Sequence, residues 1–96
     1  MSNLKRHRKI CEDIHILYAQ KNHDYGDSFS KARKVIPHYT LGKLYDKFSR
    51  YMTLTLNPES QRVKSESIKD TLMDLANYTI MELTEMEDDD NGNVEP

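Results

Sequence analysis

Residues 65–86, SESIKDTLMDLANYTIMELTEM, decide the fold class of this chain. Apolar and small side chains recur there at steps of three and four residues, the spacing of one face of an α-helix. Ser65 can cap the start of such a helix, and Glu66 in its first turn suits the positive end of the helix dipole. We therefore expect a helix from Ser65 to about Met86, with a core face of Ile68, Leu72, Leu75, Ala76, Thr79, Ile80 and Leu83.

The same periodicity predicts two more long helices and one short helix. A first helix is expected from Asn3 to Lys21, and residues 22–28 then form a loop around Gly26. Residues 29–36 are expected to form a short helix that ends before Pro37. Thr40 is the expected cap of the next long helix, which ends at Asn57-Pro58. The predicted core stripes are Leu4, His7, Ile10, Cys11, Ile14, Leu17 and Tyr18 on the first helix, and Leu41, Leu44, Tyr45, Phe48, Tyr51, Met52 and Leu56 on the second long helix.

These elements predict an all-α fold, a small bundle of three long helices with a short connecting helix. A chain of 96 residues has room for one domain, which we place at residues 1–86. Residues 87–96 carry five acids and no base, and they are expected to form a disordered acidic tail. A domain of this size buries a modest fraction of its surface, and six tyrosines and five methionines suit an exposed contact surface. We therefore expect a homo-oligomer.

Several classes of protein are excluded by what the sequence lacks. A single cysteine, Cys11, provides neither an internal disulfide nor a cysteine-based zinc site. The four histidines lack metal-ligand spacing, and no Walker loop, dinucleotide fingerprint or G-x-S-x-G motif occurs. No apolar run approaches the ~18 residues of a membrane helix, and no hydrophobic signal core follows the basic N-terminus. We expect a cytoplasmic protein without a membrane partner.

Charge is distributed unevenly along the chain. Residues 1–50 hold 11 Lys/Arg and 5 Asp/Glu, whereas residues 51–96 hold 3 and 11. Without its acidic tail the body has a small positive surplus, which suits a nucleotide or another small phosphorylated ligand. The surplus falls short of the basic stripe of a duplex DNA binder, so duplex DNA is not an expected partner.

An acidic strip on the last helix is the first candidate site. Glu66, Asp70, Asp74 and Asn77 follow each other at steps of four, four and three residues, so they share one side of that helix. Carboxylates one turn apart can share Mg²⁺, which keeps waters for a substrate phosphate. The alternative is a solvated helix face, with the repulsion between like charges offset by neighbouring bases.

The second long helix offers bases and one acid. Asp46 and Arg50 are spaced as a helical ion pair, which on its own explains them as surface residues. Alternatively, Lys47 and Arg50 face the acidic strip and bind a phosphate whose metal is held by Asp70 and Asp74, with Asp46 assisting.

The predicted loop after the first helix is the third candidate. It combines a base, a hydroxyl, a flexible backbone and aromatic rings, which together can clamp a phosphate and stack on a nucleobase. In the alternative interpretation Tyr25 and Phe29 simply close the end of the bundle. The residues concerned are Lys21, Asp24, Tyr25, Gly26, Ser28 and Phe29.

Three segments together resemble a known family. KNHDYGDSF at 21–29, LYDKFSRYMTL at 44–54 and VKSESIKDTLMDLANYTIMEL at 63–83 resemble the nucleotide modification associated domain 1 proteins, small proteins found widely in bacteriophage genomes. The resemblance implies a phage-type protein associated with nucleotide or nucleic-acid metabolism, located in the host cytoplasm. It also implies that the residues of the three candidate sites converge.

The helical pattern is also similar to that of the MazG-like all-α NTP pyrophosphohydrolases, whose metal site needs acid-rich helices that face each other. This sequence departs from that pattern, because Asp46 is the only acid on the second long helix. A second subunit would have to complete a two-metal site.

Three functional hypotheses remain. The preferred one is a nucleotide-binding protein, able to sequester a nucleotide without turnover, in which Lys47, Arg50 and Lys21 meet phosphate and Tyr25 or Phe29 stacks on the base. The second is a Mg²⁺-dependent nucleotide hydrolase that uses Glu66, Asp70 and Asp74. The third is an adaptor whose tyrosine-rich surface binds a host protein while its acidic tail imitates nucleic acid.

Overall fold

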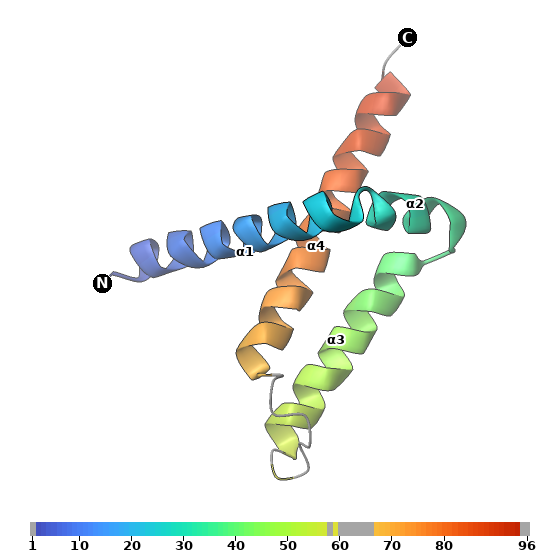
Figure 1. Cartoon of the computed structure of the whole chain (residues 1–96). Helices are drawn as coiled ribbons and strands as arrows, with labels where there is room; N and C mark the ends of the chain where they lie inside the picture. Colours follow the sequence, from blue (N-terminus) through green and yellow to red (C-terminus); the bar gives the residue numbers. More distant parts are fainter. Residues whose placement is uncertain (1, 58, 60–66, 95–96) are drawn as a thin grey trace.

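The computed structural model describes residues 2–57, 59 and 67–94, and this part of the chain contains four helices and no strand (Figure 1). The predicted all-α fold is confirmed. Among the described residues, no helix is long and apolar enough to cross a membrane. In chain order the helices are α1 (Asn3–Tyr25), α2 (Ser28–Val35), α3 (Tyr39–Leu56) and α4 (Ile68–Val94).

Helix α1 is longer than the sequence pattern predicts. It begins where the Ser2 hydroxyl accepts a hydrogen bond from the Lys5 N–H at 3.2 Å, and it continues through Tyr25. The predicted loop from residue 22 is therefore wrong, and the turn shrinks to Gly26 and Asp27. Gly26 has a φ of 64°, a conformation that glycine adopts without steric cost, and its N–H donates to the Asn22 carbonyl at 2.8 Å. The polar residues before it are compatible with a helix, so the glycine decides where α1 ends.

The start of α3 also differs from the prediction. His38, with a φ of 57°, precedes the helix, which begins at Tyr39. Thr40 is not the cap: its side chain is buried, and its hydroxyl donates to Glu82 Oε1 on α4 at 2.6 Å. Because the hydroxyl of Thr40 is hydrogen-bonded to another helix, it does not cap α3. The end of α3 agrees with the prediction, because the Asn57 N–H closes the last turn onto the Thr53 carbonyl at 2.9 Å.

Helix α4 begins later than predicted and extends beyond the C-terminal end of the predicted domain. The expected cap Ser65 lies outside the described residues, and Ser67 takes this position, accepting from the Asp70 N–H at 3.0 Å. At the other end the helix continues past Met86 to Val94, through most of the segment expected to be a disordered tail. No proline interrupts this stretch, and the carboxylate of Asp89 is held by Arg33 of α2, which favours an ordered helix there.

The helices form an open arrangement. Helices α3 and α4 lie side by side and antiparallel, α2 lies beside α4 where the chain turns from α1 to α3, and α1 crosses α4 while its N-terminal part projects away from the other helices (Figure 1). Few side chains are buried as a result. Among the described residues they are the hydrophobic Ile14, Phe29 and Leu54 and the polar Thr40, Thr71 and Asn77.

Most positions of the predicted core stripes are exposed in the single chain. On α3, Leu41 and Tyr45 are 66% and 72% exposed, while Leu54, which lies off the predicted stripe, is buried. The reason is that polar contacts select the face of α3 that meets α4, through Thr40 and Lys47. The stripe positions of α1 and α4 are also largely exposed, including Leu4, Ile10, Ile68, Leu72, Ile80 and Leu83.

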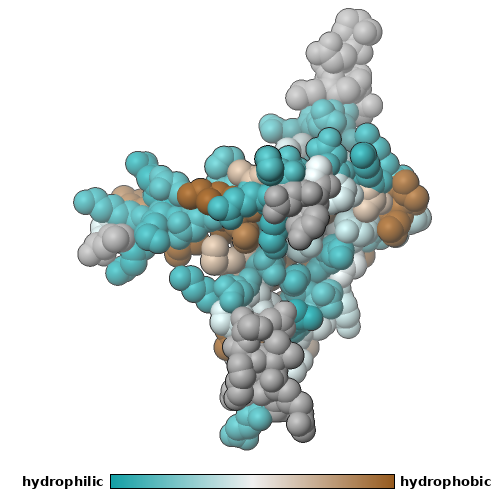
Figure 2. All heavy atoms as spheres, in the orientation of Figure 1, coloured by the Kyte–Doolittle hydropathy of each residue, from teal (hydrophilic) through white to brown (hydrophobic). Residues whose placement is uncertain are grey.

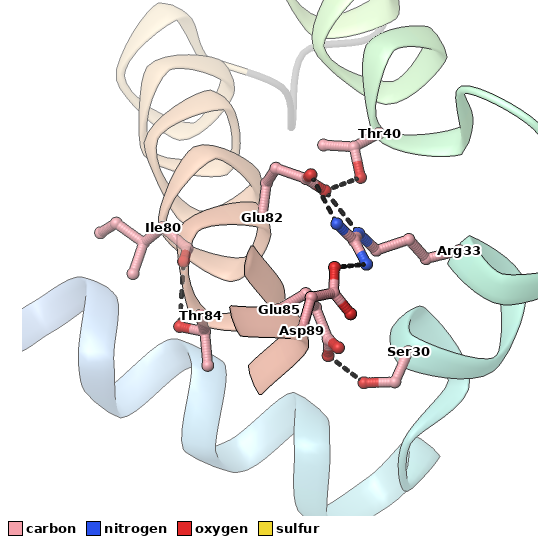
Figure 3. Close-up of polar contacts among 8 residues, drawn as sticks. All are labelled: Ser30, Arg33, Thr40, Ile80, Glu82, Thr84, Glu85 and Asp89. Atoms are coloured by element: carbon pink, nitrogen blue, oxygen red, sulfur yellow. Dashed lines mark hydrogen bonds and ion pairs between the residues drawn. The ribbon is translucent and has the colours of Figure 1, made fainter. Parts of the chain in front are cut away.

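A cluster of charged and hydroxyl groups fixes α2 and the start of α3 to the C-terminal half of α4 (Figure 3). The Arg33 guanidinium donates from Nε and Nη2 to the two oxygens of Glu82 at 2.9 and 3.0 Å, and from Nη1 to Asp89 at 3.0 Å. The Ser30 hydroxyl donates to Glu85 on the same side of α4. Such bidentate pairs are geometrically specific, so they determine where α2 lies on α4.

The pKa values of the cluster follow from these contacts. The hydrogen bond from Arg33, followed by that from Thr40, lowers the pKa of Glu82 against the opposing effect of desolvation. The same pair raises the pKa of Arg33, with Asp89 as the second contributor. Glu82 and Arg33 are therefore both ionised at neutral pH.

Candidate functional site

One cavity lies where the end of α1, the α1–α2 turn and the start of α3 meet the middle of α4. Its volume is about 120 Å³. Two of the three candidate sites, the loop after the first helix and the acidic strip, contribute six residues to it: Lys21, Gly26, Ser28, Phe29, Asp74 and Asn77. Its other lining residues are Tyr18, Asn22, Tyr39, Tyr78 and Met81.

Two lysines converge on one aspartate at this cavity. Lys47 Nζ of α3 lies 3.2 Å from Asp74 Oδ2, and Lys21 Nζ of α1 lies 3.7 Å from Asp74 Oδ1. The side chain of Lys47 is 17% exposed and that of Lys21 is 50% exposed. The three groups carry one positive charge in excess, in partly buried surroundings where charge interactions are stronger than in water. These contacts bring Lys47 of α3 to the acidic strip of α4. The positive charge in excess at Asp74 is suited to hold an anion.

An aromatic cluster forms the wall beside these charges. The ring of Phe29 lies 5.7 Å from that of Tyr39 at 61° and 6.0 Å from that of Tyr78 at 37°. Phe29 is only 9% exposed, so it closes the end of the helices, as the alternative interpretation of the loop has it. The aromatic rings with a larger accessible surface are the tyrosines at 18, 39 and 78, which are half-buried.

These three tyrosines were missed by the sequence analysis. Tyr18 belongs to the apolar stripe of α1, which is predicted to lie in the core. Tyr39 precedes the expected start of its helix. A signal was available in the helical spacing, because Tyr18 is three residues before Lys21 and Tyr78 is four residues after Asp74. Residues at such spacings lie on the same side of a helix and therefore line the same cavity.

The remaining candidate residues lie elsewhere or are not described. Asp46 and Asp70 are exposed and do not line the cavity, and the position of Asp70 in the first turn of α4 is explained by the helix dipole. Arg50 is half-buried one turn beyond Lys47 on α3. The side chains of Asp24 and Tyr25 at the end of α1, and the whole of Glu66, lie outside the part of the chain that the structure describes.

The described residues do not assemble the metal site of the hydrolase hypothesis. Within residues 2–57, 59 and 67–94, no three His, Cys, Asp or Glu side chains are placed to share a metal ion. Asp74 faces two ammonium groups, which compete with a cation for its oxygens. The geometry of the cavity suits an anion more directly than a cation.

The fold and the cavity define a small all-α protein with a pocket that contains Lys21 and Asp74 at a junction of four helices. The sequence profile of the nucleotide modification associated domain 1 family matches residues 21–86, and the chain belongs to this family. The match includes every residue of the three candidate sites, from Lys21 onward. No curated protein and no solved structure shows significant similarity to the chain, and the likeness to MazG-like pyrophosphohydrolases finds no support in these comparisons.

Proposed function

We propose that this protein binds a nucleotide, with the phosphate held at Lys21 and Lys47. The observation that carries the proposal is the convergence of two lysines from different helices on one carboxylate at the mouth of an aromatic-lined cavity. Membership of a family associated with nucleotide modification supports a nucleotide over other phosphorylated ligands. Phage origin, which the resemblance implies, extends this proposal, and so does sequestration, which is one of two uses of binding without turnover, the other being a role in nucleotide metabolism.

Asp74 holds the two ammonium groups in place when no phosphate is bound. Without it, two lysines of like charge at one cavity would repel each other and turn outward. A phosphate adds two or more oxygens that accept from the same ammonium groups, and Lys21, which is half exposed, has the freedom to rotate toward it. The first residue of α2, Ser28, also lines the cavity, so the positive end of that helix and a hydroxyl add to the attraction.

The size of the cavity indicates how a nucleotide would lie. Pockets for drug-sized ligands measure roughly 300–1,000 Å³, whereas this cavity measures about 120 Å³. It therefore has room for a phosphate and the adjoining part of the sugar. The base then lies outside the cavity, against the tyrosines of its rim rather than against Phe29.

The proposal is tested by measuring both binding and turnover with one panel of nucleotides. The protein is titrated calorimetrically with ribo- and deoxyribonucleotides, with and without Mg²⁺, and each mixture is then analysed by chromatography. Binding with recovery of the intact nucleotide supports the proposal. Mg²⁺-dependent products would replace it with the hydrolase, and absence of both binding and products across the panel would overturn it in favour of the adaptor.

A matched pair of variants assigns binding to the cavity. Lys47→Gln removes the ammonium group that pairs with Asp74 beside the cavity and should weaken binding about tenfold, the loss expected for one charge-assisted hydrogen bond. Lys9→Gln is the control: Lys9 also pairs with an aspartate, Asp13, at 3.0 Å, but neither residue lines the cavity. Equal losses in the two variants would place the phosphate outside the cavity.

A further inference from the structure

The single chain exposes much more surface than a compact monomer of this size, and many of its large hydrophobic side chains are exposed. The surface area of the chain is 7,938 Å², whereas a compact monomer of 11.3 kDa is expected to expose about 5,700 Å². The radius of gyration, 15.7 Å, likewise exceeds the roughly 12.5 Å of a compact domain. The excess of about 2,200 Å² is larger than the roughly 800 Å² that each partner contributes to a standard protein interface.

A groove between α1 and the first half of α4 is the part of this surface best shaped to receive another helix. It has a volume of about 380 Å³, and its walls are Ile10 and Ile14 of α1 and Ile68, Leu72 and Met73 of α4. Figure 2 shows apolar side chains along the projecting part of α1 and in the angle below it. Apart from Asp13 and Lys69, every residue that lines the groove is apolar.

We propose that a second copy of this chain covers the groove, related to the first by a two-fold axis. The two charged residues of the groove have opposite signs, so the patch is complementary to itself when Asp13 of one copy faces Lys69 of the other. Self-complementarity is what a two-fold interface requires, because the same patch occurs on both sides. A foreign partner would need no such balance.

The projecting part of α1 gives an independent reason for a second copy. It extends from the body without contacting α3 or the rest of α4 (Figure 1). Most of the stability of a helix in a protein comes from packing of its apolar face, yet Leu4 on this arm is 84% exposed in the single chain. Packing the arm onto a second copy covers its apolar side and the groove at once.

This interface does not depend on the proposed nucleotide site. No residue lines both the groove and the phosphate cavity, although both lie between α1 and α4. The mass of the particle in solution therefore tests the interface, and nucleotide titration tests the cavity.

Two isoleucines of α1 provide a matched test. Ile10 lines the groove and is 48% exposed, and Ile16 lies off the apolar stripe and is 54% exposed, so both accept a charge without disturbing a packed core. Sedimentation velocity of the full chain should give a dimer or a larger assembly. Ile10→Glu should raise the dissociation constant at least about 100-fold, the loss caused by a charge in the centre of an interface, and Ile16→Glu should leave it unchanged. Circular dichroism checks that both variants keep their helices.

The proposal is overturned by a monomeric wild-type protein at ~100 µM, a concentration above the roughly micromolar to picomolar dissociation constants of standard-size interfaces. It is also overturned if Ile10→Glu keeps the wild-type mass, or if both variants dissociate alike.

Cys11 allows a second measurement on the unmodified sequence. It is the single cysteine of the chain, it is exposed, and it follows Ile10 directly. A spin label on Cys11 should give an interchain distance below about 35 Å, the width of three packed helices. Absence of an interchain dipolar signal in the assembled protein would place the interface on another face and overturn the proposal.

Discussion

Two clusters join acids of α4 to bases of other helices, and their charge balance is opposite. At Glu82, one guanidinium lies between two carboxylates, with bonds of 2.9 to 3.0 Å and a hydroxyl from Thr40 (Figure 3). At Asp74, two ammonium groups share one carboxylate at 3.2 and 3.7 Å beside a cavity. Among the described residues, the first cluster has more carboxylates than cations, with its guanidinium bonded to both, and the second has more cations than carboxylates.

This difference separates a structural contact from a candidate binding site. Matched bidentate pairs fix helices relative to each other and leave nothing for a ligand to bind. Lysines in excess over their carboxylate retain donors for an anion, and their single-point contacts allow them to move. We therefore expect changes at the Glu82 cluster to alter stability and changes at Asp74 to alter binding.

The largest effect on stability is expected for Thr40→Asp. Thr40 is 6% exposed and donates to Glu82, so the new carboxylate would be buried beside another one and should cost about 3 kcal/mol. Urea unfolding at pH 7 measures the loss. Thr40→Asn is the control, because asparagine and aspartate are equally good helix caps and differ here in charge. Wild-type stability in both variants would show that residue 40 acts as a cap after all.

Thr40 also shows how far the sequence predicts this fold. The helices follow from hydrophobic periodicity, and the end of α2 near Pro37 and of α3 near Asn57 follow from local residues. A threonine before a segment of helical hydrophobic periodicity is typical of a helix cap. Here, however, the hydrogen-bond partner of Thr40 is Glu82, which is 42 residues away on α4. Contacts between distant residues also keep α4 helical to Asp89, and local patterns contain no information about them.

The candidate site was predictable where helical spacing links its members. Asp74 and Asn77 are one turn apart on α4, and Lys21 lies in the segment that resembles the family. Asp46 and Asp70 are also acids at helical spacings from other candidate residues, but both are exposed. Helical spacing shows which residues share one side of a helix, and it does not show which side meets another helix. Tyr39 and Tyr78 line the cavity through their packing on Phe29, which is a tertiary contact.

The second largest effect is expected for Arg33→Ala. The substitution leaves the partly buried carboxylate of Glu82 without its bidentate donor and releases Asp89, at a cost of about 2 kcal/mol. Lys34→Ala is the control, because Lys34 is the next residue on α2 and is exposed. Chemical denaturation measures both, and nucleotide affinity should change in neither. If the two variants lose equal stability, the cluster does not hold α2.

The difference in stability between wild type and Arg33→Ala should depend on pH, and this smaller effect has a defined sign. The pKa of Glu82 is lower in the folded chain than its ordinary value of 4.5, so its contribution is fully present above pH 4.5 and is lost as the pH falls through the folded pKa. The stability gap between wild type and Arg33→Ala should therefore be constant from pH 7 to 5 and shrink by about 1 kcal/mol on further acidification. Unfolding curves from pH 7 to 3 measure it. A gap that widens in acid would contradict the assignment to Glu82.

The smallest effect on stability, and the sharpest contrast, is expected for Asp74→Asn. The bonds to Asp74 are long and involve a half-exposed lysine, so unfolding should change by less than about 1 kcal/mol. Binding of a nucleotide should be as tight or tighter, because the aspartate no longer competes with phosphate for the two ammonium groups. Glu82→Gln is the matched control on α4, and it should lower stability without changing affinity. If the wild-type protein binds nucleotide only with Mg²⁺ and Asp74→Asn abolishes this binding, Asp74 ligates a cation. The cluster at Asp74 would then be a metal site and not a site for an anion.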